Sequence, residues 1–106
     1  DRGNFAVEKF GSNPLPEGNP LKLWMRVPSP MKIQFEVFSI TGQLVYFVPA
    51  VEFDGSDELQ EYSIPIPFGL SSGIYLVRPS AEWEGELLPG YLAGTGGEAL
   101  KIIYLR

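Results

Sequence analysis

The chain has 106 residues, 44% of them hydrophobic, with a formal net charge of −5 and neither cysteine nor histidine. This length suits one domain around one modest core, and the acidic balance argues against nucleic acid as a partner, because phosphate binding needs clustered Lys and Arg. Without cysteine no disulfide or thiolate metal site can form, and without histidine the usual general base and metal ligand are missing, so we expect no catalytic residue, no metal and no cofactor.

Apolar and polar residues alternate over short segments, and Pro or Gly interrupts nearly every longer stretch. A period of two is typical of half-buried strands rather than helices. The expected strands, in chain order, cover residues 5–10, 21–27, 31–37, 44–48, 62–66, 74–78 and 100–105. Short strands at this spacing predict an all-β sandwich.

Glycine and proline mark the expected turns. Gly42 is expected to take a positive φ in a tight hairpin over residues 40–43. Pro65 and Pro67 place their strand at an edge or end it early. Pro79 either closes the strand 74–78 or is followed by a few residues along an edge.

The domain organisation is simple, with no internal repeat. Residues 1–4 are expected to be the end of a linker, and residues 5–106 a single domain. The chain begins at Asp1, which indicates a piece of a larger protein or a processed form. It contains no apolar run of the ~20 residues that a transmembrane helix needs. It also shows no signal peptide, so the export signal of a secreted precursor would lie upstream.

Leu70-Ser71-Ser72-Gly73-Ile74-Tyr75 is the strongest local motif. A Leu, a turn of small residues, a Gly and then a Tyr at the start of a strand resemble the tyrosine corner of Greek-key sandwiches. In that corner the phenol hydroxyl bonds back to the backbone upstream. We interpret this Tyr as structural, because a buried phenol usually finds such a partner.

Two acidic segments invite a chemical interpretation. The loop 54–58 offers hard oxygen ligands for calcium, but without the spacing of an EF-hand. Glu82, Glu84 and Glu86 alternate beside Trp83, and carboxylates beside an aromatic ring can serve glycoside hydrolysis. A solvated loop and a solvent-facing strand are the favoured interpretations of the two segments.

Trp24 falls on the polar face of its expected strand, between Lys22 and Arg26. An outward Trp can be a sugar-stacking platform or an anchor for a partner, or it can lie against a cation or under a neighbouring loop. With Trp83 and Tyr91 it would make a carbohydrate-binding face, provided that the three rings lie coplanar on one exposed surface.

The last six residues form an expected strand that runs to the carboxy terminus, although most domains end in a frayed tail. They are Lys101, Ile102, Ile103, Tyr104, Leu105 and Arg106. A terminal strand at the edge of a sheet offers unpaired backbone groups that a receptor can pair with by β-augmentation. Lys101 and Arg106 would add charge steering on an acidic body.

Four motifs follow one another in a fixed order: Asn13-Pro14 after the first strand, the segments 37–45 and 70–77, and the terminal strand 101–106. Together they resemble the type A C-terminal sorting domain of proteins secreted by the type IX secretion system of Bacteroidetes. The resemblance covers about residues 5–106. The Gly-rich stretch between Val77 and Lys101 is longer than the family usually shows, which leaves its role open.

The resemblance implies an immunoglobulin-like sandwich of seven antiparallel strands that carries no catalysis. Its implied task is to take an N-terminal cargo of the same precursor from the periplasm through the outer-membrane translocon to the cell surface or medium. A sortase would cleave near Gly3 or Asn4. The recognition residues would be the terminal six, with Asn13, Pro14, Gly42, Leu70, Gly73 and Tyr75 as structural motif positions.

The principal alternative is a carbohydrate- or protein-binding sandwich module of a secreted or cell-surface protein. An enzyme would require a cleft with converging Asp and Glu. The unpaired edges of an isolated sandwich also favour a homodimer or strand exchange.

Overall fold

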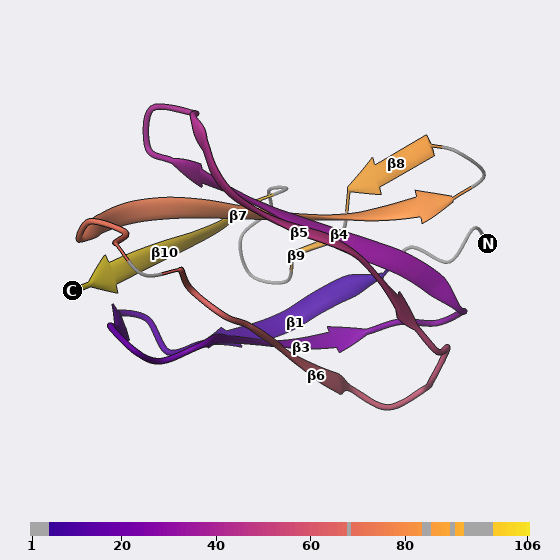
Figure 1. Cartoon of the computed structure of the whole chain (residues 1–106). Helices are drawn as coiled ribbons and strands as arrows, with labels where there is room; N and C mark the ends of the chain where they lie inside the picture. Colours follow the sequence, from indigo (N-terminus) through magenta and orange to yellow (C-terminus); the bar gives the residue numbers. More distant parts are fainter. Residues whose placement is uncertain (1–4, 68, 84–85, 90, 93–98) are drawn as a thin grey trace.

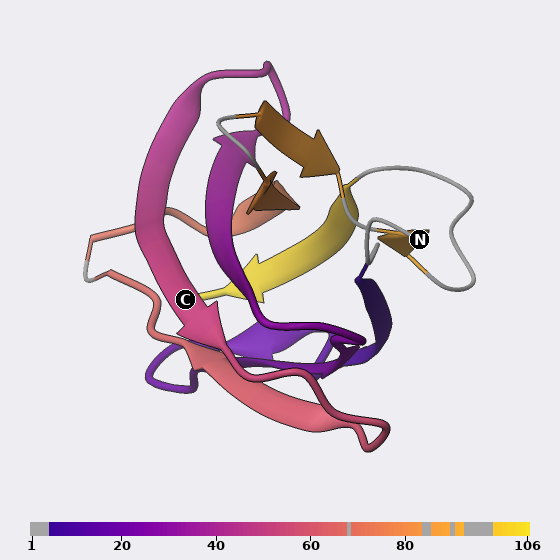
Figure 2. The ribbon, with the colours of Figure 1, turned by 90° about the vertical axis from the view of Figure 1, so that its right-hand side faces the viewer.

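The computed structural model describes residues 5–67, 69–83, 86–89, 91–92 and 99–106, and in this part of the chain every regular element is a strand. Two sheets lie one above the other, and the carboxy-terminal strand β10 belongs to the larger one (Figure 1; Figure 2). The expected linker 1–4, with the expected cleavage residues Gly3 and Asn4, lies outside the described residues.

Ten strands are described. Their bounds are β1 Ala6–Gly11, β2 Leu15–Pro16, β3 Leu21–Arg26, β4 Met31–Ser39, β5 Leu44–Phe53, β6 Gln60–Ile64, β7 Gly73–Trp83, β8 Glu86–Pro89, β9 Tyr91–Leu92 and β10 Leu100–Leu105. Seven of them have five residues or more, and each of these seven overlaps one of the expected strands, although β5 and β7 are longer and β6 begins and ends two residues earlier than expected. The all-β sandwich predicted from the alternating pattern is therefore confirmed.

One sheet has the order β6-β3-β1-β9, and the other has β2-β10-β7-β4-β5 with β8 beside β7. The pairs between the seven longer strands are antiparallel. Of the three short strands, β8 is antiparallel to β7, whereas two depart from the expected all-antiparallel arrangement: β2 runs parallel to β10 and β9 runs parallel to β1. With two residues each, β2 and β9 are too short to show an alternating pattern in the sequence.

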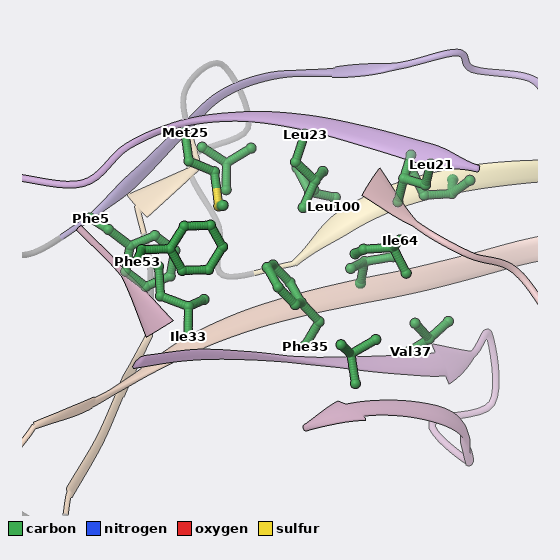
Figure 3. Packing of buried hydrophobic residues seen from close by; sticks show 14 of the residues in the cluster. Phe5, Leu21, Leu23, Met25, Ile33, Phe35, Val37, Phe53, Ile64 and Leu100 are labelled. Carbon is green, nitrogen blue, oxygen red and sulfur yellow. The ribbon is translucent and has the colours of Figure 1, made fainter. Parts of the chain in front are cut away.

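The core lies between the two sheets and follows from the alternation. On β3, Leu21, Leu23 and Met25 are buried, whereas the residues between them are exposed or half-buried. Ile33 and Phe35 of β4 approach them from the opposite sheet (Figure 3). Burying an aliphatic or aromatic side chain of this kind contributes roughly 1.5–3 kcal/mol, so these inward faces hold the sandwich together.

Strand β7 is longer than the expected 74–78 and continues through Pro79 to Trp83, between β4 and β8, which corrects the expectation that Pro79 closes the strand or is followed by a few residues along an edge. On one side β7 pairs with β4 along most of its length. On the other side β10 pairs up to Val77 and β8 begins at Ser80. Pro79 falls in the gap between these two partners, where a residue without a backbone N–H costs no ladder hydrogen bond.

Strand β5 is also longer than expected, and it contains Pro49. The strand lies at the edge of its sheet, and its register against β4 shifts between Val48 and Val51. An edge position with a register shift is where a sheet accepts proline. Within the described residues no helix is long and apolar enough to cross a membrane.

Candidate recognition site at the carboxy-terminal strand

Strand β10 alternates between the core and the solvent along its whole length. Leu100, Ile102 and Tyr104 are buried and belong to the core cluster. Ile103 and Leu105 keep 38% and 49% of their surface exposed. Of the six predicted recognition residues, Ile102 and Tyr104 are therefore structural, and Lys101, Ile103, Leu105 and Arg106 are the four that a partner can contact on the folded domain.

The outer edge of β10 is occupied, which corrects the expectation of an open terminal edge. The Asn13 side chain donates from Nδ2 to the Lys101 carbonyl (3.3 Å) and accepts at Oδ1 from the Ile103 N–H (2.8 Å). Beyond it, β2 pairs with the end of β10. A receptor that adds a strand here must first displace Asn13 and β2, so recognition through the exposed side chains is the simpler mode.

The carboxy terminus is held from two sides. The backbone N–H of Arg106 donates to Ser72 Oγ at 2.8 Å, and the N–H of Glu17 donates to the Leu105 carbonyl at 2.8 Å. Arg106 Nε also lies 3.6 Å from Glu17 Oε2, and both side chains are about half exposed. An exposed pair of this kind is worth ~0–1 kcal/mol, so the backbone contacts do more than the charges to order the chain end.

Tyr75 joins the corner before β7 to the terminal strand. Its hydroxyl donates to the Ser71 carbonyl at 2.7 Å, which is the backward bond that a tyrosine corner makes. Its ring meets the Tyr104 ring edge to face, with centroids 6.4 Å apart. Leu70 packs against the core, and Gly73 pairs with Tyr104. Of the predicted motif positions, Gly73 and Tyr75 therefore lie against β10, as Asn13 does.

The other two motif features stand apart from each other. Pro14 is exposed and directly precedes β2. Gly42 has φ +89 and donates to the Ser39 carbonyl at 2.9 Å, so it shapes the β4–β5 turn and its bonding is local. The sequence placed both residues in turns but did not indicate that the Asn13 side chain, next to Pro14, would lie against the terminal strand.

A pocket of about 240 Å³ opens beside the terminus, between the ends of the two sheets. Its lining is mostly apolar and includes Glu17, Pro20, Pro65, Ile66, Pro67 and Tyr104. Glu17, Ser72 and this pocket were missed by the sequence analysis. Three prolines from two distant loops carry no joint pattern in the sequence, and hydroxyl and carboxyl contacts to a chain end leave no periodic signal.

The acidic loop is engaged in contacts with its neighbours. Gln60 Nε2 donates to the Asp54 carbonyl at 2.7 Å, and Arg26 donates to the Asp57 carbonyl. Among the described residues no group of three or more carboxylates converges on a point that could hold a metal ion. Glu82 lies on β7, whereas Glu84 and the side chains of Trp83 and Glu86 lie outside what the structure describes.

Trp24 is half-buried, and Lys9 Nζ lies 4.7 Å from the centroid of its ring. One ring face thus contacts a cation, which is one of the interpretations that the sequence left open for Trp24. A shallow groove of about 510 Å³ runs past Trp24, Lys22 and Pro20. The backbones of Trp83 and Tyr91 belong to different sheets, on β7 and β9, and their side chains are not described.

Comparison of the sequence with protein-family models and with curated proteins gave no match.

Proposed function

We propose that this chain is a non-catalytic sorting domain that directs a cargo protein through the type IX secretion system. Its partners are then the translocon and sortase components, together with the N-terminal cargo of the same precursor. It passes through the periplasm and ends at the cell surface or in the medium. The observation that carries the proposal is the carboxy-terminal strand, which is built into the core on one face and exposed on the other.

The geometry of β10 supports this role because one face of the strand is anchored in the core and the other face is accessible to a receptor. Leu100, Ile102 and Tyr104 bind the strand to the sandwich, so its outward side chains are held in one fixed spacing. Lys101 and Ile103 are further fixed by the Asn13 amide. A receptor can read a pre-ordered strand at a lower entropic cost than a flexible tail.

We further propose that the sandwich is immunoglobulin-like with Greek-key connections. Its support is the division of the seven longer strands into β6-β3-β1 and β10-β7-β4-β5, with the tyrosine corner between β6 and β7. In immunoglobulin-like domains the corner tyrosine lies near the start of the strand that precedes the last one.

The experiment is a transport assay in a Bacteroidetes host with a working type IX system. A periplasm-exported fluorescent protein is fused to residues 1–106, and a second fusion carries the same domain followed by a short polar extension after Arg106. Secretion of the first fusion supports the proposal. Retention of the first fusion in the periplasm, with the domain folded, would overturn it. The extended fusion tests whether the free terminus itself is read.

A simple truncation is a poor control for this domain. Ending the chain at Leu100 removes Ile102 and Tyr104 from the core, so loss of secretion would also follow from unfolding. Substitution of exposed residues on β10 separates recognition from stability, because those side chains do not pack against the core cluster.

A further inference from the structure

Strand β5 is a long edge strand that pairs on one side only. It has ten residues, and among the described strands it pairs only with β4. The remaining edge strands of the described residues are shorter: β2 and β9 have two residues each, β8 has four, and β6 has five and is followed by Pro65. A strand edge of this kind presents backbone donors and acceptors that a further strand can satisfy.

The first half of β5 lacks the devices that usually block an edge. The segment Leu44–Val48 contains no charged residue, no Lys and no Pro; Pro49 and a shift in register follow it. Leu44, Val45 and Phe47 keep 50%, 37% and 43% of their surface exposed, and with Ile40 they are four of the seven large hydrophobic residues that the structure shows exposed. Exposed apolar edge strands are where proteins add strands.

The apolar surface continues from this edge across the outer face of the sheet. Leu44 pairs with Phe38, Phe38 with Leu76, and Ile74 of the same strand pairs with Ile103. Paired residues of neighbouring strands point to the same side, so a strand added at β5 would extend an existing apolar row. The β4–β5 turn stands at the same end of the molecule as the carboxy terminus (Figure 1).

We propose that two copies of this chain associate by antiparallel pairing of their β5 edges. A two-fold axis at Tyr46 places Val45 of one copy opposite Phe47 of the other, so that these two exposed apolar side chains meet across the pair. Pairing of a segment with itself about a two-fold axis closes the assembly at a dimer. The occupant is a second copy because the segment is uncharged and self-complementary, so no like charges meet directly across the pair.

The predicted dimer is weak and has a distinctive salt dependence. The regular ladder is short because register shifts lie on both sides of it, near Leu44 and after Val48. Each copy carries a net charge of −5, so the two bodies repel while the contact itself is apolar. Salt screens the repulsion, and raising the ionic strength should therefore strengthen the dimer. A dimer held by ion pairs would weaken instead.

The test is sedimentation velocity of residues 1–106 over a range of protein and salt concentrations, with two matched variants. Phe47→Lys places two ammonium groups diagonally across the two-fold pair, and Leu59→Lys makes the same charge change at a residue of similar exposure (42%) outside the segment. Phe47 pairs with Glu36, so a Lys there gains an opposite charge in the monomer and should fold. We expect Phe47→Lys to raise the dissociation constant by about tenfold or more.

Amide NMR of the unmodified chain supplies a second readout that needs no variant. Concentration-dependent shifts should centre on Val45–Val48 and fade away from β5. The proposal is overturned if the protein stays monomeric at every concentration. It is also overturned if a dimer forms that Phe47→Lys and Leu59→Lys affect equally, or whose shifts centre on β10, since either result would mean strand exchange or another interface.

Discussion

The Asn13 side chain accepts a hydrogen bond of 2.8 Å from the backbone N–H of Ile103, a residue 90 positions further along the chain. Its Nδ2 donates to the Lys101 carbonyl, so one amide replaces a strand residue along the outer edge of β10. The loop after β1 thereby closes the edge of the terminal strand. The positions of Lys101 and Ile103 depend on a residue near the opposite end of the chain.

Replacing Asn13 with Ala should lower the free energy of unfolding by about 1–2 kcal/mol, because two hydrogen bonds are lost at roughly 0.5–1.5 kcal/mol each. For a domain of this size that lowers the melting temperature by roughly 4–8 °C per kcal/mol. Asn13→Asp retains the acceptor for the Ile103 N–H, so its free energy of unfolding should lie between those of the parent and Asn13→Ala. Asn19→Ala is the control, since Asn19 bonds to Pro16 through its backbone N–H. Equal melting curves for Asn13→Ala and Asn19→Ala would contradict the bridging role.

Replacing Tyr75 with Phe removes the bond to the Ser71 carbonyl while retaining the ring contact with Tyr104. We expect a loss of about 1 kcal/mol, measured by urea unfolding. Ser71→Ala retains the carbonyl acceptor and should leave the midpoint within experimental error of the parent. If Tyr75→Phe is as stable as the parent, the corner bond does not hold the terminal strand.

Gly55 should not tolerate a side chain. A Cβ at this position would lie 2.8 Å from the Ser29 Cα and 3.1 Å from the Pro28 carbonyl oxygen. Both atoms belong to the backbone of the facing turn, so Gly55→Ala should cost about 1–3 kcal/mol. Gly11→Ala is the matched control, because nothing lies within 4 Å of the added methyl group. Equal melting temperatures for Gly55→Ala and Gly11→Ala would show that the two loops can move apart.

Tyr62 should make stability fall in alkaline solution. Its ring stacks on Phe35 with centroids 5.3 Å apart, and burial, with a smaller contribution from Tyr46, raises its pKa above the ordinary value of 10.0. Above pH 10.0 the unfolded chain loses this proton before the folded chain does. The contribution of Tyr62 to the free energy of unfolding is therefore complete below pH 10.0 and is lost as the pH rises through the raised pKa. Unfolding titrations between pH 8 and 11 should show a slope that Tyr62→Phe reduces. An unchanged slope would exclude Tyr62 as its source.

The alternating pattern was sufficient to predict the seven longer strands and the sandwich, because each of them has one face in the core. It could not reveal β2, since Leu15 and Pro16 are too few to alternate, and their partner lies at the far end of the chain. For that reason the sequence suggested an open edge at β10. The passage of β7 through Pro79 depends on which strands flank it, which no local pattern records.

The sequence predicted only part of the candidate site, again because some of its contacts join residues that are far apart in the chain. The outward positions of β10 follow from the alternation, and Tyr75 from the corner motif. The contacts of Ser72 and Glu17 with the chain end depend on the tertiary fold. Asn13 was singled out only as a motif residue, and its bond to Ile103 explains why an amide is needed there.

The most direct test of the sorting proposal is the secreted fraction of a fluorescent cargo carrying Ile103→Asp and Leu105→Asp together, compared with a cargo carrying Leu59→Asp. Both proteins should be folded, because all three side chains are exposed. We predict that the double variant stays in the periplasm and that Leu59→Asp is secreted like the parent. Secretion of the double variant at the parental level would show that the outward face of β10 is not what the secretion machinery reads.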